Sequence, residues 1–212
     1  MRRRTRHAGA LALALALLAA GAPAAPGAGP PPGLASARAL LARLRAAGRA
    51  EAQVRLTRHD PLSGRDVVVR GTLALERPGL ARLDLADGQR LTLRGDGGDM
   101  LQPAAKQLVR AGPRSAAGLL SWWGALLDPE GRGFRERRVG PRAYELTREG
   151  ASEEEAQRLT LGADGLPATL VAALGPDERV EYRLSHWRFT RARGRAGFVL
   201  QAPPGYEVVE LP

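Results

Sequence analysis

The feature that most restricts the fold of this chain is a series of short segments in which apolar and polar residues alternate. Ala52, Val54 and Leu56 form the first set, with a polar or charged residue between each pair. A period of two places the apolar side chains of a strand on one face, so each segment predicts a half-buried β-strand. Turn sequences stand between the segments, for example at 60–64 (DPLSG), 87–88 (DG) and 95–98 (GDGG). The chain is therefore predicted to be mainly β.

The alternation predicts about ten short strands, antiparallel because the connecting turns are short. The strand around 52–56 and the strand at 65–75 form a hairpin, and a meander continues with strands at 80–85, 89–94, 99–101 and 107–110. A second group is predicted at 134–139, 143–148, 156–161, 167–173, 178–185, 187–190 and 198–201. Many short strands joined by close turns favour a sandwich or a barrel.

The segment 34–47 departs from this alternation and predicts an N-terminal helix. Leu40, Leu41 and Leu44 fall on one helical face. Gly48 follows and ends the helix.

A second helix is predicted over 115–127, where Ser115 can cap the first turn. It is apolar nearly all round, through Leu119, Leu120, Trp122, Trp123, Leu126 and Leu127. A helix without a polar stripe either lies deep in a core or covers an apolar space as a lid.

Residues 1–24 have the layout of a secretory signal peptide. Arginines at the start precede an Ala/Leu run, and small residues suited to cleavage follow at 22–24. The mature protein is therefore expected in the periplasm, with 25–33 as a flexible Gly/Pro-rich leader and 34–212 as one domain. The alternative is an uncleaved anchor, but the apolar run falls short of the roughly 20 residues that a spanning helix needs.

The composition excludes thiol chemistry and does not favour nucleic-acid binding. No cysteine is present, so the chain has no disulfide, thiol nucleophile or lipidated cysteine and should be soluble once cleaved. The formal net charge is +10, with Lys106 as the only lysine. This basic excess is either a solvated surface or an aid to docking at anionic lipid headgroups.

No catalytic, metal-binding or cofactor-binding motif is recognisable. His59 and His186 are far apart in the sequence and lack metal-ligand spacing. Ser121 or Ser185 could be combined with His186 and an acid only on paper, because no G-x-S-x-G elbow occurs. The glutamates at 153–155 are typical of a solvated charge cluster. The sequence predicts a protein that is not an enzyme and uses no cofactor or metal.

Several stretches together resemble the LolA-type outer-membrane lipoprotein carriers. They are 71–85 (GTLALERPGLARLDL), 88–110 (GQRLTLRGDGGDMLQPAAKQLVR), the 115–127 helix and 198–211 (FVLQAPPGYEVVEL). In that family a glycine-led strand ends in an Arg-Pro pair, a Gly-Gln strand leads to an Asp-Gly turn, and a Pro-Pro pair and a glycine precede a final β-branched strand. The resemblance covers most of the chain after the leader.

The resemblance implies an unclosed antiparallel β-barrel with an N-terminal helix and a helical lid. Its apolar interior would accept the acyl chains of lipoproteins, or related lipids, and carry them as a monomer from an inner-membrane lipoprotein-releasing transporter to an outer-membrane receptor. In relatives the arginine of the Arg-Pro pair bonds to the lid backbone and helps to switch the lid. The matching residue is Arg77, whose alternative role is simply to close the end of a strand.

The expected ligand-binding residues are those of the apolar wall and of the lid: Leu73, Leu75, Leu83, Leu91, Leu93, Leu119, Leu120, Trp122 and Trp123. The chain departs from typical carriers, whose first helix and first strand are rich in aromatics, because all nine aromatics here lie between Trp122 and Tyr206. Two alternatives stay open. The leucines can fill an ordinary core without a cavity, and the fold can serve as a lipid- or partner-sensing module of an envelope-stress system.

Overall fold

The computed structural model describes residues 34–60, 64–113, 133–148, 150, 156–173 and 179–211. The predicted signal peptide, the leader and the 115–127 helix lie outside these described residues. Strands dominate the part of the chain that is described, so the predicted mainly β class is confirmed.

The described chain begins with a short 3-10 helix and the predicted helix, followed by strands throughout. The first group comprises η1 (Ala35–Ala37), α1 (Arg38–Ala47), β1 (Arg49–Asp60), β2 (Arg65–Glu76), β3 (Leu80–Leu85), β4 (Arg90–Arg94), β5 (Gly97–Gln102), η2 (Pro103–Ala105) and β6 (Gln107–Ala111). The second group comprises β7 (Phe134–Arg138), β8 (Ala143–Arg148), β9 (Gln157–Leu161), β10 (Pro167–Ala173), β11 (Arg179–Thr190), η4 (Arg195–Phe198) and β12 (Glu207–Leu211).

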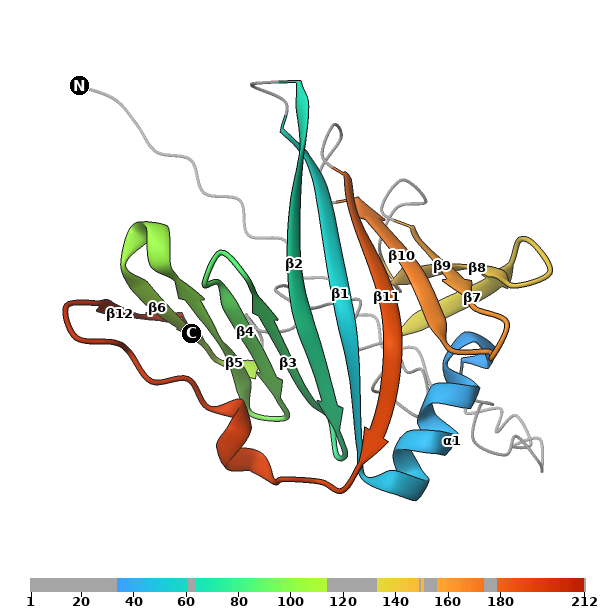
Figure 1. The fold of residues 1–212 in the computed structure, drawn as a ribbon, viewed down its shortest axis with the longest axis horizontal. Helices are drawn as coiled ribbons and strands as arrows, with labels where there is room; N and C mark the ends of the chain where they lie inside the picture. Colours follow the sequence, from blue (N-terminus) through green and yellow to red (C-terminus); the bar gives the residue numbers. More distant parts are fainter. Residues whose placement is uncertain are drawn as a thin grey trace, which may run out of the picture.

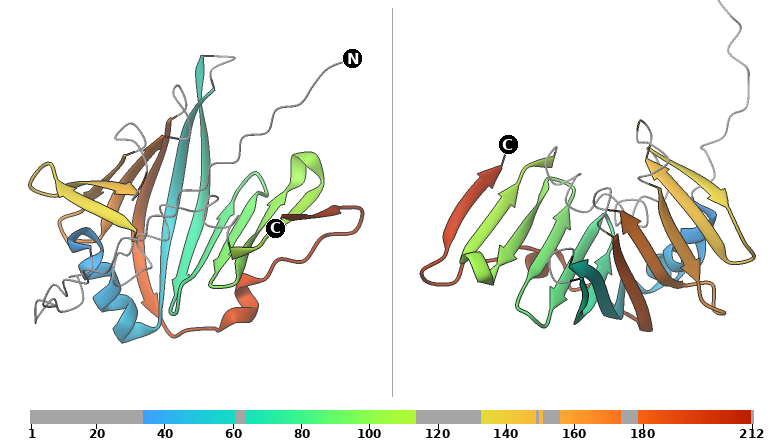
Figure 2. Two further views of the ribbon diagram at one scale, coloured as in Figure 1. Left: turned by 180° about the vertical axis from the view of Figure 1, so that it is seen from behind. Right: turned by 90° about the horizontal axis from the view of Figure 1, so that it is seen from above.

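One sheet of twelve strands contains all of these strands, in the order β12-β6-β5-β4-β3-β2-β1-β11-β10-β9-β8-β7. β1 and β2 form the predicted hairpin and are paired along their full length. The neighbouring strands are antiparallel, except that β12 runs parallel to β6. The sheet bends without closing on itself (Figures 1 and 2). The predicted unclosed antiparallel architecture is therefore confirmed, with a parallel strand added at one edge.

The alternation seen in the sequence gives the sheet two different faces. In β2, Leu73 and Leu75 are buried on the face that carries α1, which we call the inner face, whereas Thr72 is exposed on the opposite, outer face. Leu83 of β3 and Leu146 of β8 belong to the same inner cluster, although several other strands lie between β3 and β8 in the sheet. The inner face is thus the inside of the bend.

Helix α1 forms where alanine, leucine and arginine, all good helix formers, surround a buried leucine face. Gly48 ends it with a φ of 98°, in the left-handed region that glycine adopts without strain. At the other end, the N–H groups of Ala35 and Ser36 donate to the carboxylate of Glu136 in β7, at 2.8 and 3.0 Å. An edge strand of the sheet thereby satisfies free donors at the start of this helical segment.

The strand predicted at 198–201 is wrong. Phe198 ends η4, and residues 199–206 are not part of the sheet. Phe198 and Leu200 are buried while Val199 is exposed, so the side chains alternate as they would in a strand. The backbone does not pair as a strand, because the N–H of Leu200 donates to the carboxylate of Asp99 at 2.9 Å instead of to a neighbouring strand.

The two strands predicted at 178–185 and 187–190 are a single strand, β11, with a β-bulge. His186 has a φ of 53° at the position where the sequence pattern breaks. Glu51 lies opposite Arg188 and Gln53 lies opposite Ser185, so two residues of β11 stand against one residue of β1. A bulge interrupts the alternation without interrupting the strand.

Candidate functional site

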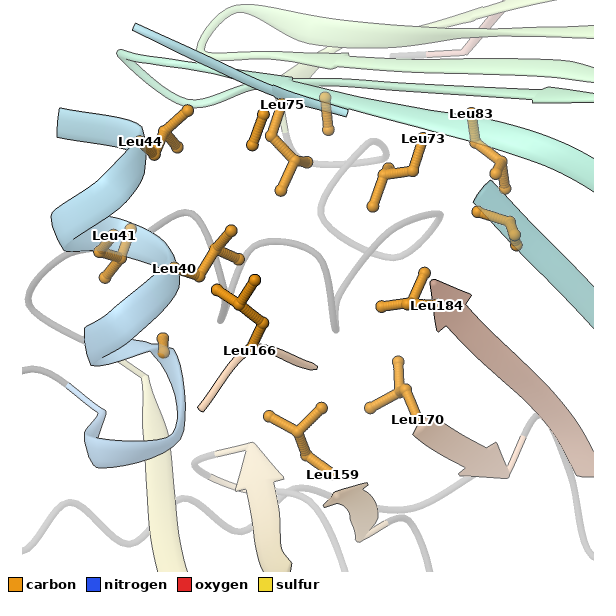
Figure 3. Close-up of a cluster of buried hydrophobic side chains, with 14 of the residues drawn as sticks. Leu40, Leu41, Leu44, Leu73, Leu75, Leu83, Leu159, Leu166, Leu170 and Leu184 are labelled. Carbon is orange, nitrogen blue, oxygen red and sulfur yellow. The ribbon is translucent and has the colours of Figure 1, made fainter. Parts of the chain in front are cut away.

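Three of the predicted wall residues, Leu73, Leu75 and Leu83, lie in the buried cluster on the inner face. None of them is more than 4% exposed. In Figure 3 they approach the leucines of α1 from one side, and leucines from the other half of the sheet approach from the opposite side. The labelled leucines of this cluster are Leu40, Leu41, Leu44, Leu73, Leu75, Leu83, Leu159, Leu166, Leu170 and Leu184.

The other two predicted wall residues, Leu91 and Leu93 of β4, are only partly buried. They pack against the same cluster from the side of the sheet beyond β3, together with Val69 of β2. Helix α1 contacts β1 and β11, so among the described elements it covers the inner face near the middle of the sheet. The partly buried residues therefore extend the apolar surface of the inner face away from the helix.

The predicted lid residues Leu119, Leu120, Trp122 and Trp123 lie outside the described residues. Arg77 is described, and it is exposed in the turn between β2 and β3. Its side chain makes none of the hydrogen bonds or ion pairs found between described residues. The role of Arg77 as a lid switch stays a prediction.

Part of the outer face is covered by residues 191–206, here called the strap, which connect β11 in the middle of the sheet to β12 at its edge (Figure 1). Glu76, 1% exposed, receives the N–H groups of Arg193 and Gly194 at 2.9 and 3.0 Å. The guanidinium of Arg49 donates to the same carboxylate at 2.6 Å and lies over the ring of Phe198. Glu76 thus fixes the beginning of the strap to the end of β2.

Burial by itself raises the pKa of the Glu76 carboxyl. The hydrogen bonds from the N–H of Arg193, the Arg49 guanidinium and the N–H of Gly194, together with the charge of Arg49, outweigh that effect and hold the pKa below its ordinary value. Glu76 is therefore ionised at neutral pH, and its charge is matched by donors on three sides.

A second carboxylate, Asp99 of β5, fixes the later part of the strap. Arg94 bonds it at 2.7 and 3.0 Å and also donates to the carbonyl of Phe198, while the N–H of Leu200 donates to the same carboxylate. Burial acts to raise the pKa of Asp99, but the hydrogen bonds from Arg94 and from the N–H of Leu200 overcome it and lower the pKa. Beyond this point Leu200 packs with Leu101 and Leu108 in a small outer cluster.

Glu76, Arg94 and Asp99 were not predicted as site residues from the sequence. A polar residue on the outer face of an alternating strand gives the same pattern whether water or another segment covers it. The covering segment comes from a part of the chain about a hundred residues later in the sequence; Leu200, for instance, bonds to Asp99. No local signal marks these residues as buried.

The outer face also has a pocket of about 460 Å³, under and beside the strap. Four arginines, two carboxylates and His186 line it. Two of the arginines are engaged with the carboxylates: Arg49 Nε lies 2.7 Å from Glu51, and Arg82 Nε lies 2.8 Å from Asp84. The pocket lies on the opposite side of the sheet from the leucine cluster.

Tyr182 is a titratable residue that packs against the inner cluster. Burial raises the pKa of Tyr182, on the inner side of β11, to about 12, so its phenol stays neutral at physiological pH. Within the described ranges no group of three or more His, Asp or Glu side chains is arranged to hold a metal ion. No helix in those ranges is long and apolar enough to cross a membrane.

No family model matches the chain, and no curated protein matches its sequence significantly. Among solved structures, an uncharacterized conserved protein from Thermus thermophilus is similar with a TM-score of 0.47, at 16% identity over 82% of this chain and 99% of that one. A LolA superfamily protein from Nitrosomonas europaea gives 0.41, at 11% identity over 77% and 97%. Lipoprotein LppX from Mycobacterium tuberculosis gives 0.35, at 13% identity over 72% and 93%.

The resemblance to LolA-type carriers expected from the sequence is thus also found among solved structures. All three values of the TM-score are below 0.5. Function therefore has to be inferred from the residues of this chain.

Proposed function

We propose that this protein is a periplasmic carrier that binds the acyl chains of lipoproteins, or of related lipids, on the inner face of its sheet and shuttles them from the inner to the outer membrane. The observation that carries the proposal is the apolar character of that face. It begins as a packed leucine cluster under α1 and continues in partly buried residues of β2 and β4, namely Val69, Leu91 and Leu93.

The energetics favour such a role for an apolar concave surface. Burying one methylene group is worth about 0.8 kcal/mol, so a lipid anchor with several acyl chains cannot cross an aqueous compartment unassisted. A carrier needs apolar surface that is sheltered from water when empty and accessible when cargo arrives. Partly buried residues beside a packed core meet this requirement better than a fully packed core does.

The proposal includes the parts predicted from the sequence. The helix with Trp122 and Trp123 is the lid over the inner face, and Arg77 at the end of β2 is the residue that switches it. The monomeric carrier receives cargo from an inner-membrane transporter and delivers it to an outer-membrane receptor. The signal-peptide layout supports export, and the absence of a catalytic motif supports a binding role rather than an enzymatic one.

Two adjacent valines of β2 provide a matched test of acyl binding. Val69 faces inward and is partly buried, whereas Val68 is 43% exposed on the outer face. We expect Val69→Gln to weaken binding of a fluorescent triacylated lipopeptide about tenfold, the change that 1.4 kcal/mol produces, and Val68→Gln to leave it unchanged. Thermal unfolding of both variants checks that each one folds. Equal affinity of the two variants would contradict binding at the inner face.

Shuttling needs its own test, because a protein can bind lipid without transporting it. Purified protein added to spheroplasts should release newly acylated lipoproteins into the medium, and Arg77→Leu should reduce that release. Binding of the lipopeptide without release would restrict the function to lipid binding. Native mass spectrometry of protein taken from the envelope would then separate storage of a lipid from sensing, since a sensor would carry a bound regulatory protein.

A further inference from the structure

The bulge in β11 determines which side chains reach the outer-face pocket. Without it, strict alternation from Ser185 would direct His186 and Arg188 to the inner face and Trp187 to the outer face. With it, His186 and Arg188 line the outer pocket, while Trp187 packs against the inner cluster. The bulge therefore places a cation in the pocket, and it does so with a non-glycine residue at a φ of 53°. Backbone conformations of this kind are uncommon and are concentrated at binding sites.

Among the described residues, Arg188 is the pocket arginine that no carboxylate engages. It lies directly opposite Glu51 in the β1–β11 register, but the Glu51 carboxylate is already bonded by Arg49 at 2.7 Å. Arg188 is exposed and takes part in no ion pair between described residues. Arg193 of the strap stands close by and reaches Glu51 only at 3.8 Å.

Two uncharged donors line the same pocket as these arginines. Gln53 of β1 and Thr72 of β2 are cross-strand neighbours, both are exposed, and both line the pocket. An amide, a hydroxyl and guanidinium groups that converge from β1, β2, β11 and the strap suit an anion with several acceptor oxygens in a three-dimensional arrangement. A phosphate group matches such a donor set more fully than a planar carboxylate does.

The neighbouring part of the outer face adds positive charge. One outward-facing row further along the strands, Arg55 is paired directly with Arg70 on one side and with Arg183 on the other. Arg183 is bonded to Glu181, whereas Arg55 and Arg70 make no ion pair with another described residue. Like charges placed opposite each other destabilise a sheet. A bound anion nearby would offset that repulsion.

We propose that the outer-face pocket binds the phosphate group of an organic molecule, with Arg188 as its principal cation and with Arg193, Gln53 and Thr72 as further donors. The volume of about 460 Å³ is in the range of small-molecule sites and exceeds what a bare phosphate fills. The site lies on the side of the sheet away from the acyl-binding face, so it does not depend on the proposed carriage of lipids. Its phosphate can come from a soluble phosphomonoester or from a phospholipid headgroup.

A titration of ¹⁵N-labelled mature protein with glycerol 3-phosphate tests the site. We expect saturable amide shifts at Gln53, Thr72 and Ser185–Arg188, weaker binding of inorganic phosphate at the same residues, and no such shifts with sodium chloride at matched ionic strength. Arg188→Gln should weaken the binding about tenfold, equivalent to 1.4 kcal/mol. Arg135→Gln, at an exposed arginine of β7 on the far edge of the sheet, should leave it unchanged.

The two sources of phosphate are separated by vesicle sedimentation. If the headgroup is the ligand, vesicles of phosphatidylglycerol retain the wild-type protein and the Arg135→Gln variant better than they retain Arg188→Gln. If a soluble phosphomonoester is the ligand, the Arg135→Gln and Arg188→Gln variants sediment equally with the vesicles. The wild-type protein still binds glycerol 3-phosphate in that case. An absence of saturable shifts with either phosphate, or wild-type affinity of a folded Arg188→Gln variant, would overturn the proposal.

Discussion

The two faces of the sheet are covered in different ways. On the inner face, α1 packs through Leu40, Leu41 and Leu44, which contribute apolar area and no directional bond. On the outer face, the strap is held by two buried carboxylates, Glu76 and Asp99, which receive its backbone N–H groups. Apolar packing distributes stability over many atom contacts, each of which contributes little. The strap depends on a few hydrogen bonds, and the loss of one partner leaves others buried and unsatisfied.

The largest effect should come from breaking the strap at Glu76. Glu76→Ala leaves the largely buried guanidinium of Arg49 with a single carboxylate partner, Glu51, and leaves the N–H groups of Arg193 and Gly194 without an acceptor. Removing one partner of a buried ion pair costs about 4 kcal/mol, which urea denaturation should record as a loss of unfolding free energy. Faster hydrogen exchange at Arg193 and Gly194 should accompany it. An unchanged midpoint of unfolding would show that the strap does not contribute to stability.

A comparable but smaller loss is expected on the inner face. Leu44 is fully buried between α1 and the sheet, and Leu44→Ala should reduce the free energy of unfolding by about 3 kcal/mol through lost burial and a residual cavity. Exchange at the strap amides should not change, since those groups lie on the other side of the sheet. If Leu44→Ala loosens the strap as much as Glu76→Ala does, the two covers are not independent.

Acid should weaken the outer cover more than the inner one. The resulting loss of unfolding free energy should be smaller than the loss caused by either substitution. The pKa values of Glu76 and Asp99 are lowered in the folded protein from ordinary values of 4.5 and 3.8. Their contribution to stability is therefore complete above the ordinary values and is lost as the pH falls through the lowered ones. Wild-type protein should lose more unfolding free energy than Glu76→Gln as the pH is reduced below about 4.5. Parallel pH profiles of the two proteins would contradict this assignment.

Much of the fold could be predicted from the sequence because its signals are local. Alternation and turn residues placed β1 to β4 within a few residues, and three leucines at helical spacing with a terminal glycine placed α1. The strand predicted at 198–201 failed for a physical reason. Phe198 and Leu200 alternate in burial because they lie on the sheet, but the N–H of Leu200 donates to a carboxylate rather than to a neighbouring strand.

The candidate sites also differ in whether local sequence signals could predict them. The inward position of Leu73, Leu75 and Leu83 follows from a period of two, and the structure places all three in one cluster. The outer pocket could not be predicted, because Arg188 lies on its side of the sheet only through the bulge at His186, and the strap adds Arg193 from a different part of the chain. In the sequence, the bulge was visible only as an interruption between two predicted strands.

The parallel pairing of β12 with β6 has a consequence for the order of folding. Gln107 is paired with Glu207, 100 positions later in the sequence, whereas the strands from β1 to β6 pair with one another in chain order. Contacts between distant residues form late because a long loop must be closed first. As the chain is synthesised, the free edge of β6 stays without its partner until β12 has emerged, and during that time it is exposed to wrong strand pairing.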